Sequence, residues 1–226
     1  MTVAAVITAA GYGTRLGSDL PKALVVVHGR TLLAHALDRV TAVASVIVVT
    51  APSTHVAQFA DEVGARATVV VGGESRQASV LAGVRALGAA GIDDDDIVLV
   101  HDAARAFMPA AAMRRAVDAV RAGADAAIPV IPVVDTLVSA PDPDGAYGES
   151  VDRESLRAVQ TPQVFRAVVL DDAHRRAATD GLEATDDATL VRHYDYSVVA
   201  TEGHVWGFKV THMSDLALAE HIAAQV

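Results

Sequence analysis

The sequence predicts an α/β fold in which helices cover both faces of a mainly parallel sheet, and a β-hairpin arm protrudes from it. Short β-branched runs alternate with helix-like segments through the first half of the chain, as in βαβ units. The runs are apolar throughout, which is typical of parallel strands buried on both faces. One later stretch rich in Pro, Gly and Asp interrupts the alternation. The 226 residues suffice for a buried core, and we expect a single domain over residues 1–226.

The expected elements follow one another in regular order. Apolar runs predict strands at residues 3–8, 45–50, 67–71, 97–101 and 125–134. Helical patterns predict helices at residues 31–43, 53–63 and 76–90. An acidic run at residues 93–96 is expected to be a solvated loop before a strand. Prolines in the last strand predict that it lies near an edge or a bend of the sheet.

The order changes after this strand. Short alternating runs flank the segment PDPDGAYG, so we expect an extended hairpin arm from Thr136 to about Arg157. Long insertions of this kind are usually functional or pack between subunits. The remaining expected elements are helices from near Arg166, a late strand at residues 204–211 and a C-terminal helix at residues 214–225 with Ser214 as its N-cap.

The chain is acidic and contains no cysteine. It has 18 Lys and Arg against 28 Asp and Glu, a formal net charge of −10, whereas nucleic-acid binding needs a basic face. The lack of cysteine excludes disulfides, thiolate metal sites and a cysteine nucleophile. No apolar run reaches the ~18 residues of a membrane span, and the N-terminus lacks a signal-peptide pattern. We therefore expect a cytoplasmic protein with no nucleic-acid and no membrane partner.

A glycine-rich loop, AAGYGTRLGSDLPKA, occupies residues 9–23 directly after the first strand, where open α/β sheets bind ligands. It is not a P-loop, because no Gly-Lys-Ser/Thr sequence ends it. It also lacks the G-x-G-x-x-G pattern of dinucleotide-binding loops, because position 16 is Leu. The loop is therefore built for a different ligand.

Small residues and two cations define this loop. The small residues let the backbone approach a ligand closely, and their N–H groups can line an anion site; they are Ala9, Ala10, Gly11 and Gly13. Arg15 and Lys22 flank them with two positive charges, which suits a polyphosphate. The alternative is a tight turn with two solvated cations.

Seven further motifs follow the loop along the chain. They are GGESRQASVLAGV, VHDAAR, DT, VDR, TPQVF, TDDA and FKVT. The loop resembles the A-A-G-x-G-x-R-(L/M)-G-x-x-x-P-K signature of sugar-nucleotide-type nucleotidyltransferases. Each motif alone is weak, but the ordered set, from residue 3 to about residue 220, resembles the 2-C-methyl-D-erythritol 4-phosphate cytidylyltransferase family of the non-mevalonate isoprenoid pathway.

The resemblance implies a fold and an activity. The fold would be the Rossmann-like three-layer sandwich of nucleotidyltransferases, with an arm that crosses to a partner in a homodimer. The substrate phosphate would attack the α-phosphorus of CTP in line and expel pyrophosphate, giving 4-diphosphocytidyl-2-C-methyl-D-erythritol. An alternative is a CTP-dependent enzyme for another sugar-alcohol phosphate, such as ribitol 5-phosphate. A third hypothesis is a non-catalytic nucleotide-binding module.

The resemblance also assigns residues to roles. The catalytic set is Arg15, Lys22, Arg153 and Lys209. The expected CTP contacts are Ala9, Ala10, Gly11, Gly13, Gly73, Glu74, Ser79, Asp102 and Ala103. The expected contacts to methylerythritol phosphate are Asp102, Arg105, Thr136, Arg153, Thr161, Thr185 and Lys209. Magnesium is the implied cofactor, held mainly by CTP phosphates, with Asp102 as the candidate protein ligand.

The same motifs also have purely structural interpretations. Ser75 can cap the helix that begins after it, and Thr185 or Asp186 can open a short helix. Two positions depart from the family pattern: Thr8 stands where proline is usual, and Ala23 where glutamine is common. Neither position supplies a charge, so we expect these departures to affect the shape of the base pocket rather than catalysis.

Overall fold

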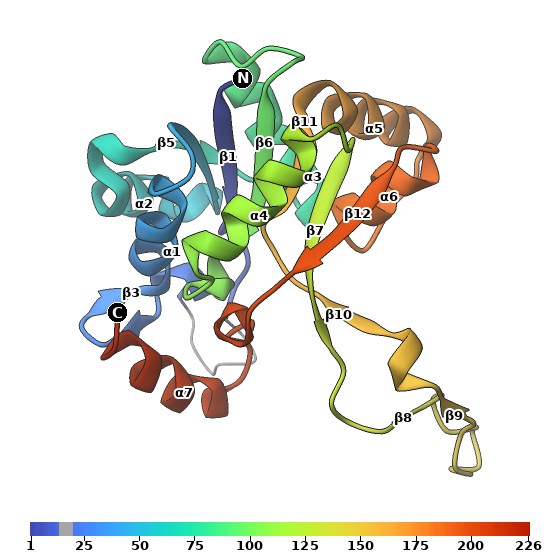
Figure 1. The fold of residues 1–226 in the computed structure, drawn as a ribbon. Coiled ribbons are helices and arrows are strands. Elements are labelled where there is room, and N and C mark those ends of the chain that lie inside the picture. Colours follow the sequence, from blue (N-terminus) through green and yellow to red (C-terminus); the bar gives the residue numbers. More distant parts are fainter. Residues whose placement is uncertain (14–19) are drawn as a thin grey trace.

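The computed structural model describes residues 1–13 and 20–226 of the chain. Its centre is an eight-stranded sheet with the order β10-β7-β11-β6-β1-β4-β5, and β12 pairs with β7 (Figure 1). The strands are β1 (Val3–Thr8), β4 (Val46–Ala51), β5 (Thr68–Val71), β6 (Ile97–Asp102), β7 (Ala126–Pro132), β10 (Arg157–Val159), β11 (Gln163–Arg166) and β12 (Val198–Glu202). The β6-β1-β4-β5 half is parallel, whereas β10 and β11 are antiparallel to their neighbours. The predicted mainly parallel sheet is thus confirmed.

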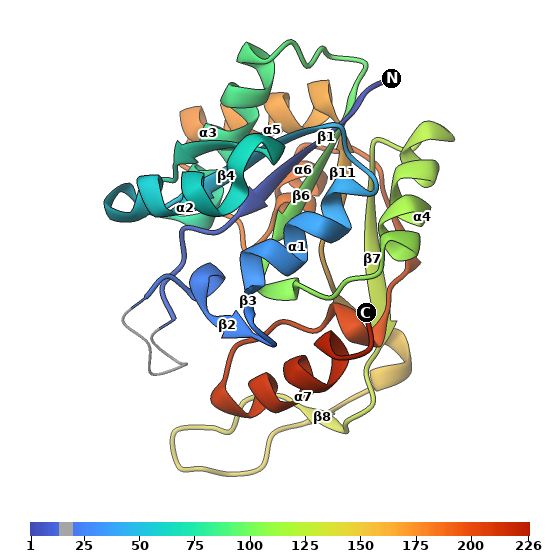
Figure 2. The same cartoon turned by 90° about the vertical axis from the view of Figure 1, so that its left-hand side faces the viewer.

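Helices lie on both faces of the sheet (Figure 2). They are α1 (Leu32–Thr41), α2 (Val56–Val63), α3 (Arg76–Ala89), α4 (Ala110–Arg121), α5 (Ala167–Asp180), α6 (Asp187–His193) and α7 (Met213–Ala223). Side-chain caps begin several of them, because the first backbone N–H groups of a helix lack partners within it. Thr31 accepts from the N–H of Ala34, and Ser75 accepts from the N–H of Ala78.

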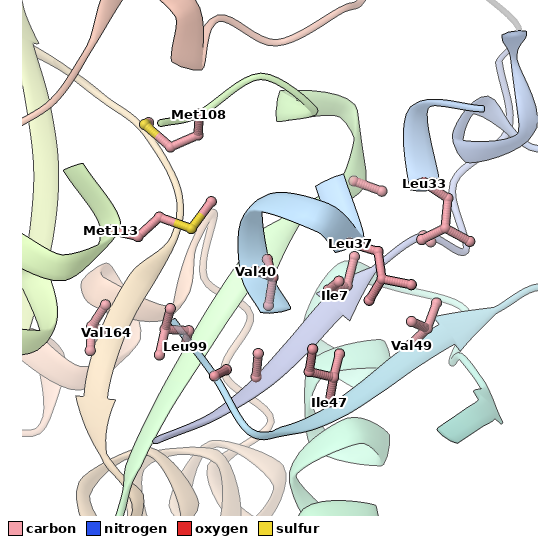
Figure 3. Close-up of a cluster of buried hydrophobic side chains, with 14 of the residues drawn as sticks. Ile7, Leu33, Leu37, Val40, Ile47, Val49, Leu99, Met108, Met113 and Val164 are labelled. Atoms are coloured by element: carbon pink, nitrogen blue, oxygen red, sulfur yellow. The ribbon is translucent and has the colours of Figure 1, made fainter. Parts of the chain in front are cut away.

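The alternation of side chains along β1 explains the three layers. Ala5 and Ile7 join the core under α1, α2 and α4, whereas Ala4 and Val6 join the core under α3, α5 and α6. Successive side chains of a strand point to opposite faces, so an apolar strand has to be covered twice. Figure 3 shows the first of these cores.

On the opposite face, α3 packs unusually close to β1. A Cβ added to Gly83 would collide with the side chain of Val6, so glycine at this position permits the close approach.

Two predictions for the C-terminal part are wrong. Residues 204–211 are not a strand; they contain a 3-10 turn, Val205–Gly207, and an irregular segment. Ser214 is not the N-cap of α7, which begins at Met213 after the N-cap His212. The carboxylate of Asp215 accepts from the backbone N–H groups of Thr211 and His212, which fixes the helix start earlier.

The segment between β7 and β10 extends away from the sheet (Figure 1). It contains a short antiparallel pair, β8 (Leu137–Val138) with β9 (Ser150–Val151). Val134 and Tyr147 are 79% and 81% exposed on it. Among the described residues, no helix is long and apolar enough to cross a membrane.

Candidate active site

A cavity of about 280 Å³ lies at the carboxyl ends of β1 and β6. Thr8 ends β1 and Asp102 ends β6, and both residues line the cavity. This is the edge at which open parallel sheets bind ligands, because loops and helix N-termini converge there. The predicted site residues that line it are Ala9, Ala10, Gly11, Lys22, Gly73, Glu74, Ser79, Asp102, Ala103 and Lys209.

The chain contains two lysines, and both line this cavity. The ammonium group of Lys22 donates to the carbonyl of Val210 at 2.8 Å, directly beside Lys209 in the chain. The ammonium group of Lys209 lies 2.7 Å from Oδ2 of Asp102. The fold therefore gathers every lysine of an acidic protein at one point.

Asp102 is the centre of the polar contacts in the cavity. Its Oδ2 accepts from Lys209, and its Oδ1 accepts from the hydroxyl of Thr8 at 3.1 Å and from Nε of Arg76 at 3.3 Å. Burial acts to raise the pKa of Asp102, but the adjacent Arg76 and Lys209 cations hold that pKa well below its usual range. The Asp102 side chain is therefore a buried carboxylate that fixes two cations.

Thr161 supports Asp102 from behind rather than lining the cavity. Its hydroxyl accepts from the backbone N–H of Asp102 at 3.0 Å and lies 3.1 Å from Nδ1 of His101. Burial is the main cause that lowers the pKa of His101 to about 4, so this imidazole is neutral at pH 7.

Ser79 and two glycines shape the turn between β5 and α3, part of which lines the cavity. The hydroxyl of Ser79 accepts from the N–H of Gly73 at 3.1 Å and donates to the carbonyl of Ser75 at 2.9 Å. A Cβ on Gly72 would lie 2.8 Å from Cβ of Ala10 and 2.9 Å from Oγ of Ser79. The chain just after β5 thus passes close against Ala10 of the glycine-rich loop, and the Ser79 hydroxyl holds the turn between β5 and α3.

Arg76 is a cavity residue that the sequence prediction did not include. Its Nη1 donates to Oδ2 of Asp187 at 2.6 Å, while Oδ1 of Asp187 lies 3.0 Å from Nε2 of His174. Burial acts to raise the pKa of Asp187, but the hydrogen bond from His174 and the charge of Arg76 lower it. Arg76 lies in the GGESRQAS motif and Asp187 in the TDDA motif, so these motifs could have identified both residues as part of the site. No sequence motif marks His174.

Other predicted site residues do not line the cavity. Gly13 is buried, and its N–H donates to the carbonyl of Leu20 at 3.3 Å. The guanidinium of Arg105 donates to the carbonyls of Gly207 and Val159 at 2.7 and 3.2 Å, so it ties two backbone segments together. Thr185 is exposed beside α6, which Asp186 caps at the N–H of Thr189.

The two predicted residues of the hairpin segment are also outside the cavity. Thr136 and Arg153 are exposed, and Nη1 of Arg153 donates to the carbonyl of Val134 at 2.9 Å. The predicted catalytic residue Arg15 lies outside the described residues.

Comparisons with known proteins give one consistent result. Residues 3–225 match the model of a family described as 2-C-methyl-D-erythritol 4-phosphate cytidylyltransferase (IspD). The chain is 44% identical to a protein of this description from Thermus thermophilus, over 99% of the chain and 98% of that protein. A relative from Rhodococcus jostii is 42% identical, over 99% of the chain and 96% of that protein.

Solved structures resemble the fold over its full length. The crystal structure of a Thermus thermophilus 2-C-methyl-D-erythritol 4-phosphate cytidylyltransferase has a TM-score of 0.81 at 40% identity and covers 99% of this chain and 100% of that one. A crystal structure of a 4-diphosphocytidyl-2C-methyl-D-erythritol synthase has a TM-score of 0.83 at 28% identity and covers 98% of each chain.

Proposed function

The chain belongs to the 2-C-methyl-D-erythritol 4-phosphate cytidylyltransferase family, and we propose that the cavity around Asp102 is where it transfers CMP from CTP to 2-C-methyl-D-erythritol 4-phosphate. The products are 4-diphosphocytidyl-2-C-methyl-D-erythritol and pyrophosphate. One observation carries the assignment of this cavity: both lysines of the chain, with Arg76, converge on it at the ligand-binding edge of the sheet.

The chemistry requires charge and alignment more than proton transfer. A phosphate monoester has a second pKa of about 6, so the attacking phosphate is already ionised at neutral pH. The site therefore aligns two anions and stabilises the negative charge on the α-phosphoryl oxygens and the leaving pyrophosphate. We assign this stabilisation to Lys22 and Lys209, together with Arg15 from the same loop.

The glycine-rich loop and the turn before α3 are proposed to hold the cytidine and triphosphate. The N–H of Ala9 donates to the carbonyl of Thr50 at 3.0 Å, so this amide serves the fold and not the ligand. The N–H of Gly73 likewise donates to the hydroxyl of Ser79. The backbones of Ala10 and Gly11 then carry the proposed contacts, with Gly73, Glu74 and Ser79 at the rim and wall.

The acceptor phosphate is proposed to bind between Lys209 and residues of a second subunit. Arg105, Thr161 and Thr185 stay predictions for this subsite; the bonds of Arg105 and Thr161 favour supporting roles for both. Thr136 and Arg153 are exposed on the hairpin segment, where Val134 and Tyr147 are also exposed. We propose a homodimer in which this arm, residues 136–157, reaches the partner's cavity.

Magnesium is proposed to enter with CTP, as part of the substrate. Both oxygens of Asp102 already accept from cations, Lys209 at 2.7 Å and Arg76 at 3.3 Å, so Asp102 does not fit as a direct magnesium ligand in this arrangement. Among the described residues no cluster of three or more His, Asp or Glu side chains offers another cage. An ion that keeps its waters and binds phosphate oxygens needs no such cage.

Pyrophosphate release tests the function and the choice of acceptor. With magnesium and CTP, we expect release with methylerythritol phosphate and little with ribitol 5-phosphate, ATP, GTP or UTP. Release only with ribitol 5-phosphate would select the alternative enzyme. Nucleotide binding without release from any pair would favour the non-catalytic module. A cytoplasmic location stays a prediction from sequence.

A further inference from the structure

Behind the cavity, a chain of buried charged groups links the sheet edge to two helices that do not line it. From the cavity inward, Arg76 on α3 contacts Asp187 on α6, and Asp187 contacts His174 on α5. The side chains of His174 and Asp187 are 0% and 2% exposed. Neither group reaches the cavity, and the phosphoryl transfer described above uses neither.

The two carboxylate oxygens of Asp187 have different partners, His174 and Arg76. An ionised carboxylate only accepts hydrogen bonds, so Nε2 of His174 carries the proton in this contact. His174 thereby fixes Oδ1 and leaves Oδ2 to accept from Nη1 of Arg76 at 2.6 Å. On the other side, Nε of Arg76 reaches Asp102, so the guanidinium is held at two edges.

The start of α6 is itself clamped. Gln163 donates to the carboxylate of Asp186 at 2.8 Å and accepts from the N–H of Ala188 at 3.0 Å. These two contacts bracket Asp187 in the chain and tie it to β11. Asp187 is therefore a fixed anchor rather than a mobile counterion.

We propose that Asp187, oriented by His174, is a positioning residue that holds the Arg76 guanidinium in place in the cavity. An arginine side chain loses rotamer freedom when a ligand fixes it. A guanidinium that is fixed before CTP arrives avoids that loss at binding. Through its contact with Asp102, it also keeps Asp102 and Lys209 in their relative positions. This inference rests on the proposed function of the cavity.

A positioning role and a simple charge effect of Asp187 predict opposite changes in CTP affinity when Asp187 is replaced by Asn. Asp187→Asn removes one negative charge near a site for a polyanion, so a purely electrostatic role predicts tighter CTP binding. Loss of the anchor predicts weaker binding and slower turnover.

The test is a double-mutant cycle on Asp187→Asn and Arg76→Gln. Pyrophosphate release from CTP and methylerythritol phosphate gives kcat and KM, and calorimetry gives CTP binding. We expect Asp187→Asn to lower kcat/KM by about tenfold or more, and to cause no further loss once Arg76 is Gln. Wild-type activity of Asp187→Asn, tighter CTP binding, or losses that multiply in the double variant would overturn the proposal.

Controls separate this role from general stability. Asp180→Asn, on α5, removes a carboxylate that accepts from the hydroxyl of Tyr194 at 2.8 Å and does not line the cavity, so it should leave activity unchanged. If Asp187→Asn does not fold, His174→Leu and His174→Gln carry the test. His174→Leu should lower kcat/KM several-fold, and His174→Gln, which keeps a donor, should recover most of it; equal activity of the two would reject the proposal. A wild-type enzyme without release would reject the function instead, while CTP binding would still report on Arg76.

Discussion

Replacing Lys22 should lower the rate of the reaction without affecting folding. Its ammonium group makes a contact to the carbonyl of Val210 but lies at a cavity, not in a core. We expect Lys22→Ala to fold normally and to lose about 10²–10³ in kcat, because one preorganised charged donor is removed. Steady-state pyrophosphate release measures the loss. Arg85→Ala, an exposed cation on α3, is the matched control, and near-normal turnover of Lys22→Ala would remove Lys22 from the mechanism.

His101 makes a pH prediction for stability. Its folded-state pKa is lowered to about 4 by burial, against about 6.5 in an unfolded chain. The unfolded state then binds more protons between these values, so stability falls as pH falls from ~6.5 to ~4 and levels off below. The expected loss is roughly 3 kcal/mol.

Urea unfolding at several pH values measures this loss, and His101→Asn should flatten the curve in that window. The lowered pKa of Asp102 affects a lower pH range. The contribution of Asp102 to folding stability is fully present above its unfolded-state pKa of about 4 and is lost as the pH falls below that value. An unchanged curve in His101→Asn would assign the loss to other groups.

At the scale of elements, the sequence was informative where its periodicity was strong. The apolar β1, β4, β5 and β6 and the helices α1 and α3 occur close to their predicted positions. The helix α4 and the strand β12 were not predicted, although AAAMRRAVDAVR has the apolar spacing of an amphipathic helix. Residues 204–211 look like a strand by composition, but their contacts with Gln160 and Arg105 favour a turn.

Within α3, two glycines allow a matched test of packing. Gly83 faces Val6 of β1, and a Cβ there would collide with it, whereas a Cβ on Gly88 would meet nothing within 4 Å. We expect Gly83→Ala to destabilise the protein by about 1–3 kcal/mol through overpacking. Gly88→Ala should stabilise it by about 0.5–1 kcal/mol, since alanine lowers the entropy cost of the helix. Chemical denaturation of both variants measures the contrast, and equal effects would contradict the close α3–β1 packing.

At the scale of the whole molecule, the sequence predicted which motifs lie at the ligand-binding edge of the sheet, but not which side chains contact one another. Motifs that follow parallel strands contain predicted residues that line the cavity, such as Gly11, Gly73 and Asp102, because parallel strands end at one edge. The predicted residues Arg105, Thr161 and Thr185 do not line it. The Arg76–Asp187 pair joins residues 111 positions apart and depends on how α3 and α6 pack, which no local pattern encodes. Arg105 and Thr161 have side chains suited to a ligand, yet their polar groups contact the protein itself.

The hairpin segment makes a prediction about assembly. A variant that joins β7 to β10 by a short linker should be a monomer without turnover, because it loses Thr136, Arg153 and the exposed apolar side chains together. Light scattering and pyrophosphate release measure the two properties. A fully active monomer would refute the dimer proposal.

Subunit mixing gives the sharper control for this assembly. Lys22→Ala and Arg153→Ala dimers should each be inactive, but a mixed dimer contains one site with Lys22 from one chain and Arg153 from the other. Free exchange should therefore restore roughly a quarter of the wild-type activity. Exchange without recovery would show that the arm does not serve the partner.

Because the chain has only two lysines, their side chains can serve as NMR probes of the cavity. Reductive methylation with carbon-13 would label the α-amino group and two side chains, and both side chains report from the same hollow. Their resonances can then follow nucleotide, acceptor and product in turn, with no engineered tag and almost no background.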